Sequence, residues 1–306
     1  MKILLFGANG QVGWELQRSL SPLGEVIALG HRDADLAQPV RGHIERHRPD
    51  VIVNAAAYTA VDQAETETEL AMRVNAGAVA EMAQAAAASG ALLVHYSTDY
   101  VFDGEKDGVY VESDPTNALS SYGRSKLAGE HAICAEAGCR HLVFRTSWVY
   151  AVRGKNFART ILQRARTMDR LQVVADTTGA PTSAELIADV TALALQQCRQ
   201  EGLVQARPRA DADAGLGIFH LVPSGATTWH EYACHLVAQA RAAGIALRVE
   251  PQAIAPVPAS AFPAPARRPR NSRMSNQRLA ERFGLTLPDW RLHVNRFVDA
   301  LAREKS

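Results

Sequence analysis

The first half of the chain alternates short apolar runs with longer segments whose apolar residues recur at helical spacing. In the segment 11–21, for example, Val12, Leu16 and Leu20 lie on one face of a helix. Continuously apolar strands separated by amphipathic helices are typical of a parallel sheet that is covered on both faces. The predicted strands are Lys2–Phe6, Glu25–Leu29, Val51–Val53, Leu92–Tyr96 and Leu142–Arg145, and the predicted helices are Gln11–Ser21, Val40–His47, Thr66–Ser89 and Ser121–Ala137.

Right-handed crossovers between such strands produce a doubly wound sheet that binds ligands at the carboxyl ends of its strands. We therefore predict an α/β fold in which residues 1–150 form a Rossmann-like domain with a parallel sheet. Residues 151–306 are expected to form a smaller, mostly helical domain, with some later segments packing back on the sheet. Its predicted helices are Asn156–Thr167, Ala184–Cys198, Thr228–Ala243 and Gln277–Phe283, and short strands are predicted near Leu171–Val174 and Ile218–Leu221.

Two segments of the second half do not fit a regular element. Gln205–Gly217 is polar, small and charged, which predicts a mobile surface insertion. Pro251–Arg273 contains six prolines and cannot form a regular helix.

Composition narrows the classes of protein and of partner. The chain has 306 residues, of which 47% are hydrophobic, so it can bury a sizeable core and is not a disordered protein. Its formal charge is +1, so no global field attracts nucleic acid or an anionic membrane, and neither partner is expected. The apolar run Ile3–Phe6 is far shorter than that of a signal peptide, which indicates a cytoplasmic protein. The four cysteines form no CxxC pair and are expected to be reduced thiols: Cys134, Cys139, Cys198 and Cys234.

A glycine-rich loop follows the first predicted strand directly and opens the first helix. Its glycines permit positive φ and let the backbone approach a pyrophosphate, while the helix N-terminus supplies free N–H groups. Inside a strand–helix–strand unit this pattern predicts dinucleotide binding, although a plain turn would also use glycine. The loop residues are Gly7, Asn9, Gly10, Gln11, Val12 and Gly13.

The end of the second strand indicates which dinucleotide is bound. An acidic residue there would hydrogen-bond the adenosine ribose of NAD, but this chain has Gly30, with Arg32 two residues later. A guanidinium can pair with a 2′-phosphate, so we predict NADPH as the cofactor. If Arg32 is only a solvated loop residue, NADH is accepted as well. Asp35 and Leu36 would then flank the adenine.

Tyr122 and Lys126 stand four residues apart on a predicted helix and therefore share a face. A nearby cation favours the phenolate and is expected to lower the pKa of the phenol. Thr98 lies at the carboxyl end of the fourth strand, where it could hydrogen-bond a reacting carbonyl oxygen. The alternative is a buried tyrosine beside an exposed helix lysine.

Together these residues resemble the extended short-chain dehydrogenase/reductase family. The resemblance rests on the glycine loop, on Asn54 and the three alanines after it, on Thr98, and on the Tyr122/Lys126 pair. It is narrower for the members that use NAD(P)H to reduce the C4 ketone of dTDP-4-dehydro-6-deoxy-L-mannose to dTDP-L-rhamnose, the last step in making this precursor of cell-surface polysaccharide. The resemblance therefore implies an NAD(P)-binding domain, a sugar-binding domain and a nucleotide-sugar substrate.

The resemblance also implies roles for single residues. Tyr122 would be the proton donor, and Lys126 would activate it and hold the nicotinamide ribose. Thr98 and Asp99 would contact the sugar, and Trp148 would pack on it, although a tryptophan here could also belong to the core. The residues implied to line the cofactor are Asn9, Gln11 and Val12 at the pyrophosphate, Asp35 and Leu36 at the adenine, and Ala57, Tyr58, Thr59 and Tyr96 elsewhere.

Four arginines end the proline-rich segment, and a nucleotide diphosphate is a natural anion for one or two of them. Arg267 and Arg268 are our candidates, and a solvated basic loop accounts for the arginines that do not bind it; the sequence does not decide between these two and Arg270 and Arg273. A nucleic-acid role is not expected, because no basic face accompanies the run.

Some relatives bind magnesium through three glutamates at a homodimer interface. Glu15 and Glu185 match two of these positions, but Ala300 stands at the third, so both the metal and the homodimer stay open.

Two other functions compete with ketone reduction. A sugar-nucleotide dehydratase or epimerase is one, but Tyr100 follows Thr98 and Asp99 where a dehydratase would have a carboxylate. A regulatory subunit that binds NADP(H) without turnover is the other.

Overall fold

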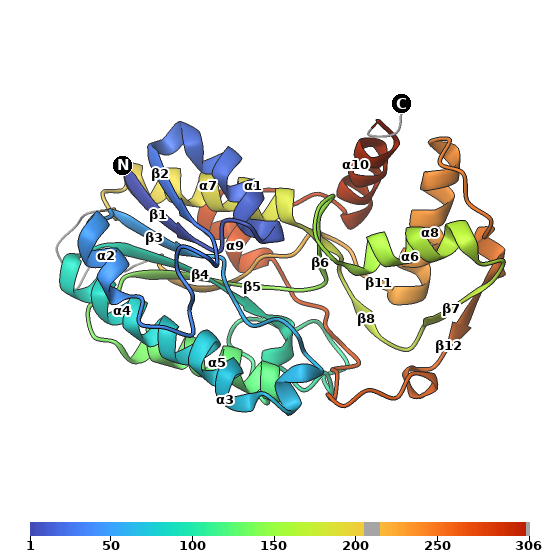
Figure 1. Cartoon of the computed structure of the whole chain (residues 1–306), viewed down its shortest axis with the longest axis horizontal. Coiled ribbons are helices and arrows are strands. Elements are labelled where there is room, and N and C mark those ends of the chain that lie inside the picture. Colours follow the sequence, from blue (N-terminus) through green and yellow to red (C-terminus); the bar gives the residue numbers. More distant parts are fainter. Residues whose placement is uncertain (205–214, 304–306) are drawn as a thin grey trace.

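The computed structural model describes residues 1–204 and 215–303, so most of the predicted insertion Gln205–Gly217 lies outside the described residues. The chain forms a six-stranded sheet of order β10-β5-β4-β3-β1-β2, and every neighbouring pair is parallel (Figure 1). This confirms the predicted parallel sheet. The strands are β1 (Lys2–Phe6), β2 (Glu25–Leu29), β3 (Val51–Asn54), β4 (Leu92–Thr98), β5 (His141–Thr146) and β10 (Gly217–His220).

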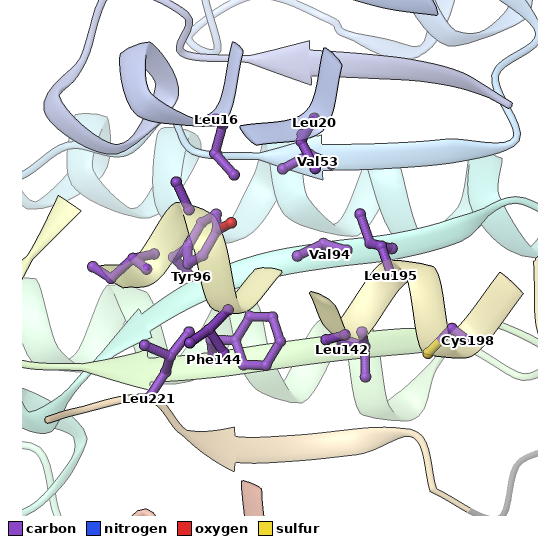
Figure 2. Packing of buried hydrophobic residues seen from close by; sticks show 14 of the residues in the cluster. Leu16, Leu20, Val53, Val94, Tyr96, Leu142, Phe144, Leu195, Cys198 and Leu221 are labelled. Carbon is purple, nitrogen blue, oxygen red and sulfur yellow. The ribbon is translucent and has the colours of Figure 1, made fainter. Parts of the chain in front are cut away.

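Helices cover both faces of the sheet, because its strands are apolar on both sides. Figure 2 shows one face, where leucines of α1 and α7 lie over Val53, Val94 and Leu142 of the strands. The opposite face packs against α2, α4 and α5. The predicted doubly wound, Rossmann-like fold is therefore confirmed. The helices are α1 (Gln11–Leu20), α7 (Ala184–Gln200) and α9 (Gln277–Phe283) on the first face, and α2 (Arg41–His47), α4 (Ala78–Ser89) and α5 (Ser121–Ala135) on the second.

The helix predicted at Thr66–Ser89 differs from the observed one. It begins as α3 (Thr68–Met72), continues through a π-helical turn, η3 (Arg73–Gly77), and ends as α4. The π turn brings Asn75 against α5, as described below.

A second lobe has its own hydrophobic core, rich in aromatic residues such as Tyr150, Tyr232 and Trp290. Its helix α10 and strand β12 are not predicted by the sequence pattern. Strand β12 includes Pro256 and pairs only with β7, and an edge strand tolerates a proline that a central strand would not. The elements are α6 (Phe157–Thr167), β7 (Leu171–Val174), α8 (Trp229–Ala242), β12 (Ile254–Val257) and α10 (Trp290–Arg303).

The chain crosses between the two lobes several times. After β5 it enters the second lobe, returns for α7 and β10, and leaves again for α8 before α9 rejoins the sheet (Figure 1). Two short strand pairs accompany these crossings: β6 (Val149–Tyr150) with β9 (Thr182–Ser183), and β8 (Thr178–Gly179) with β11 (Thr227–Thr228).

The cysteines and the helices bear on the class of protein. All four cysteines are free, as predicted. None of the described helices is both long and apolar enough to cross a lipid bilayer.

Candidate active site

The glycine loop turns sharply between β1 and α1. Gly7 has a φ of +82°, and a Cβ at Gly13 would lie 2.1 Å from the carbonyl oxygen of Gly7, so both positions require glycine. Gly10 precedes the first helical residue, and no side chain caps the N-terminus of α1. The backbone N–H groups of Gln11, Val12 and Gly13 are therefore available to an anion such as a pyrophosphate.

The end of β2 is shaped by the same loop. A Cβ at Gly30 would lie 2.3 Å from the side-chain nitrogen of Asn9, so Asn9 occupies the space that an acidic residue at position 30 would need. The amide of Gly30 donates to the carboxylate of Asp33 at 2.9 Å. Arg32 is exposed beside them, whereas the side chain of Leu36 is buried in the core between the sheet and α2.

The loop after β3 is held by a buried asparagine of the π turn. The side-chain oxygen of Asn75 accepts from the amide of Tyr58 at 2.9 Å, and its nitrogen donates to the carbonyl of Tyr58 at 3.0 Å. The same nitrogen donates to Ser125 of α5 at 2.9 Å. This arrangement fixes Ala57, Tyr58 and Thr59 at the carboxyl edge of the sheet, close to α5.

Thr98, the last residue of β4, lies beside Tyr122 of α5. Its hydroxyl donates to the Asp99 carboxylate at 2.9 Å and also lowers the pKa of Tyr122 through a hydrogen bond. Burial outweighs that bond and, with the charge of Asp99, raises the pKa of Tyr122 to about 12. The phenol is therefore protonated at neutral pH.

This direction is opposite to the one expected from the sequence. Lys126 is buried, but its Nζ donates to the carbonyl of Tyr96 at 2.7 Å and lies 3.2 Å from His95 Nε2. Nζ is therefore directed to β4, and desolvation of the phenol decides the pKa of Tyr122.

Glycines let α5 approach its neighbours closely. A Cβ at Gly123 would lie 2.3 Å from the carbonyl oxygen of Tyr100, and one at Gly129 would lie 2.2 Å from that of Asn75. The helix also begins with a side-chain cap, because Ser120 accepts from the amide of Gly123 at 3.1 Å. These contacts explain how Tyr122 comes to face the end of β4.

Trp148 has an unusual backbone and a stacked side chain. Its φ is +50°, a conformation that non-glycine residues rarely adopt. The indole stacks on that of Trp229 with ring centroids 3.6 Å apart, and a Cβ at Gly179 would lie 2.6 Å from it. One face of Trp148 is therefore covered by the second lobe, and the ring is fixed from two sides.

The arginine run separates into different environments. Arg268 forms an ion pair with Asp62 at 2.7 Å and lowers the pKa of Tyr100 through a hydrogen bond, although burial leaves that pKa above its ordinary value. The ring of Tyr100 contacts that of Tyr122 edge to face. Arg273 donates to the backbone of Asp107, so its role is structural. Arg267 and Arg270 are exposed.

Comparison with known proteins places the chain in a family. The family described as RmlD substrate binding domain matches residues 1–303. A dTDP-4-dehydrorhamnose reductase of Burkholderia thailandensis is 51% identical over 296 residues, which cover 96% of this chain and 97% of that relative. The chain belongs to the dTDP-4-dehydrorhamnose reductase family.

Solved structures of the family share the fold over nearly the whole chain. A dTDP-4-dehydrorhamnose reductase from Clostridium acetobutylicum has a TM-score of 0.85 at 34% identity, covering 98% of this chain and 99% of that one. One from Bacillus anthracis, in complex with NADP, has a TM-score of 0.83 at 30% identity and covers 97% of this chain and 98% of its own. The resemblance drawn from the sequence is thus confirmed.

The candidate magnesium ligands of the family are paired with cations in this chain. Glu15 lies 3.4 Å from Arg18, and Glu185 lies 3.4 Å from Arg296 and 3.7 Å from His293. These contacts hold the pKa of Glu185 below its ordinary value. Among the described residues, no three His, Cys, Asp or Glu side chains are grouped to hold a metal ion. Within this chain, Glu15 and Glu185 therefore already have cationic partners.

Tyr96 turns its ring away from the site and its backbone toward it. Its hydroxyl lies 2.8 Å from that of Thr191, and its ring is buried beneath α7, as Figure 2 shows. Only its backbone carbonyl faces the site, where it accepts from Lys126.

Sequence reasoning missed two residues that shape the site, His95 and Trp229. His95 carries a signal that could have been used, since it is the one polar residue in the apolar run Leu92–Tyr96 apart from the tyrosine itself. Trp229 carries none, because its contact with Trp148 joins residues far apart in the chain.

Proposed function

We propose that this protein reduces the C4 ketone of dTDP-4-dehydro-6-deoxy-L-mannose, giving dTDP-L-rhamnose, with NADPH as the preferred reductant. The observation that carries the proposal is the hydrogen bond between Thr98 and a protonated Tyr122, one helical turn from Lys126. Residues 1–150, with the later segments that complete the sheet, would bind the cofactor. The remainder of 151–306 would bind the sugar.

The cofactor would lie along the carboxyl ends of the strands. The free N–H groups of α1 would hold its pyrophosphate, and exposed Arg32 would pair with a 2′-phosphate. The relative from B. anthracis was solved in complex with NADP, which supports this assignment. When bound, NADPH supplies the hydride. NADH would be accepted less well, because it lacks the phosphate that Arg32 would contact.

The chain's own residues would supply the proton and polarise the ketone. Burial keeps the hydroxyl of Tyr122 protonated, so it is ready to donate to the developing alkoxide. The hydroxyl of Thr98 would donate to the same oxygen after releasing Asp99. Tyr100 has no carboxylate with which to deprotonate a carbon, so reduction is favoured over dehydration.

The nucleotide sugar would be held by residues of both lobes. Asp99, buried at the end of β4, would accept from a sugar hydroxyl. The fixed indole of Trp148 would pack against the deoxysugar. Arg268, and with it Arg267, would face the diphosphate, with Arg268 exchanging Asp62 for a phosphate oxygen.

The test is a Tyr122→Phe variant, assayed by the loss of NADPH absorbance with the nucleotide sugar. We expect kcat to fall by about 10²- to 10⁴-fold, the usual contribution of a general acid, while NADPH binding is retained. Tyr232→Phe is the matched control, because that hydroxyl lies in the aromatic core of the second lobe. A Tyr122→Phe enzyme with near-normal kcat would rule out this proton donor.

The same assay separates an enzyme from a regulatory subunit. Wild-type protein that binds NADPH but gives a flat trace with the nucleotide sugar would favour the regulatory function. Because the Tyr–Lys pair and Thr98 have no use in a subunit that only binds, we expect turnover, in the cytoplasm where both substrates are made.

A further inference from the structure

A buried histidine that the proposed mechanism does not use lies against Lys126. His95 is 1% exposed, in the middle of β4, and both of its ring nitrogens have neighbours. Nδ1 lies 3.1 Å from the side-chain nitrogen of Asn54, and Nε2 lies 3.2 Å from Nζ of Lys126. The protonation of this ring can be worked out from these partners.

The orientation of the Asn54 amide is fixed first. Its side-chain oxygen accepts from the backbone amide of Ala56 at 3.1 Å, so its nitrogen is the atom that faces His95. An amide nitrogen only donates. Nδ1 of His95 must therefore be the accepting, unprotonated nitrogen, and a neutral ring then carries its proton on Nε2.

That proton points at the amine of Lys126. The lysine already donates to the carbonyl of Tyr96 at 2.7 Å, and a carbonyl oxygen can only accept. An ammonium group has no lone pair with which to accept from Nε2–H, whereas a neutral amine has one. The contact at 3.2 Å is therefore satisfied only when Lys126 is neutral.

We propose that His95 is a positioning residue whose Nε2–H donates to neutral Lys126, so that deprotonation of the lysine is coupled to the tautomer of the imidazole. When Lys126 is charged, the ring must move its proton to Nδ1. Asn54 must then turn its amide and give up the hydrogen bond from Ala56. His95 therefore favours the neutral amine of Lys126. Its effect on catalysis, which rests on the proposed function, is exerted through Lys126.

The other groups around Lys126 are consistent with this coupling. On its own helix, Glu130 is paired with Arg145 at 2.6 Å, and Tyr122 is uncharged at neutral pH. Among the described residues, the neighbouring elements contribute the neutral groups Asn54 of β3, which contacts His95, and Asn75, which reaches α5 through Ser125. Burial lowers the pKa of Lys126 to about 8, although Glu130 opposes this, and burial together with the lysine charge holds the pKa of His95 well below its ordinary value.

The decisive experiment uses cofactor-free protein labelled with ¹⁵N-histidine, so it does not depend on the proposed function. The His95 signals are assigned by their loss in His95→Gln. We expect a ring protonated on Nε2 above the lysine pKa of about 8, and a shift of the proton to Nδ1 below it. The shift should vanish in Lys126→Met. A ring protonated on Nδ1 throughout, or one that does not respond to the lysine titration, would overturn the proposal.

A second measurement follows the alkaline limb of the pH profile of kcat/KM. In His95→Gln the side-chain amide can turn its oxygen to the ammonium of Lys126, which raises the pKa of Lys126. We therefore expect the alkaline limb to shift to higher pH by about one unit, which corresponds to a tenfold change in the deprotonation equilibrium of the lysine. His220→Gln is the control, since it also replaces a fully buried histidine of the sheet. If folded His95→Gln keeps the alkaline limb of the wild-type profile, the coupling is contradicted. Absence of turnover in the wild type instead would count against the proposed function alone.

Discussion

At the scale of single residues, the buried carboxylate of Asp99 lowers the free energy of unfolding at neutral pH. Its carboxyl group is 2% exposed, and burial raises its pKa to about 6 although the hydroxyls of Ser272 and Thr98 bind it. The folded protein therefore holds this proton more tightly than the unfolded chain does. The resulting stabilisation is complete below the unfolded pKa of about 4 and is lost as the pH rises through 6.

Asp99→Asn should therefore be more stable than the wild type at neutral pH. A shift of two pKa units corresponds to about 3 kcal/mol, which is an upper limit for the gain. Urea unfolding at neutral and at acidic pH measures the difference, which should shrink toward zero on acidification. A variant that is equally destabilised at both values would show that the buried charge is not the cause. Its activity should fall, since the carboxylate would no longer accept from the sugar.

Arg32 gives a prediction about the cofactor. Arg32→Asp should lower the ratio of kcat/KM for NADPH to that for NADH by about 10- to 100-fold, because a hydrogen bond to a charged group contributes about 1.5–3 kcal/mol. Arg41→Asp is the matched control, since this exposed arginine on α2 pairs with Glu45. An unchanged ratio in Arg32→Asp would mean that the guanidinium does not contact the 2′-phosphate.

At the scale of elements, the position of α5 depends on its close contact with the π turn. Gly129→Ala would place a methyl group 2.2 Å from the backbone oxygen of Asn75, where only movement of the helix relieves the clash. We expect a loss of about 1–3 kcal/mol in the free energy of unfolding, as for an overpacked core. Gly42→Ala on α2 meets nothing within 4 Å and should instead stabilise by up to about 1 kcal/mol. Denaturant curves of both variants test the contrast, and equal effects would contradict it.

Helices and strands with a clear local pattern of apolar residues could be predicted from the sequence, and others could not. Strand β1 is buried on both faces and leaves an unbroken apolar run, so it has the predicted bounds. Strand β2 also has them, although it is an edge strand and only partly buried. Helix α10 was missed because its apolar stripe has polar residues between its members. Asp289, directly before Trp290, is a capping signal that could have been used, since its carboxylate accepts from the amide of Arg291 at 3.0 Å. The π turn depends on the contact of Asn75 with α5, which local spacing does not record.

For the site, residue type and strand position were enough to bring Thr98 and Tyr122 together. The direction of the Tyr122 pKa was not predictable, because it depends on how deeply the phenol is buried and on where Lys126 points. The stacking of Trp148 on Trp229 likewise required the path of the chain between the lobes.

At the scale of the whole molecule, the chain crosses repeatedly between the lobes, so the stability of each lobe depends on that of the other. Helix α7 returns to the sheet from the second lobe, and Glu185 at its start pairs with Arg296 of α10. Unfolding of either core would therefore displace segments that belong to the other core.

We therefore expect a single unfolding transition in denaturant. Tryptophan fluorescence follows mainly the second lobe, where Trp229 and Trp290 lie, while far-ultraviolet circular dichroism follows both lobes. The two curves should coincide. A plateau in one of them, or midpoints that differ, would indicate lobes that unfold independently.

The contact between Gly30 and Asn9 limits how cofactor preference can evolve. A carboxylate at position 30 would require the Asn9 side chain to move, because its Cβ would lie 2.3 Å from the Asn9 side-chain nitrogen, and Asn9 belongs to the loop that would bind the pyrophosphate. A change toward NADH through an acidic residue at position 30 would therefore also displace or replace Asn9. Positions 9 and 30 are then epistatic for this route, whereas a substitution of Arg32 acts on the proposed preference without involving Asn9.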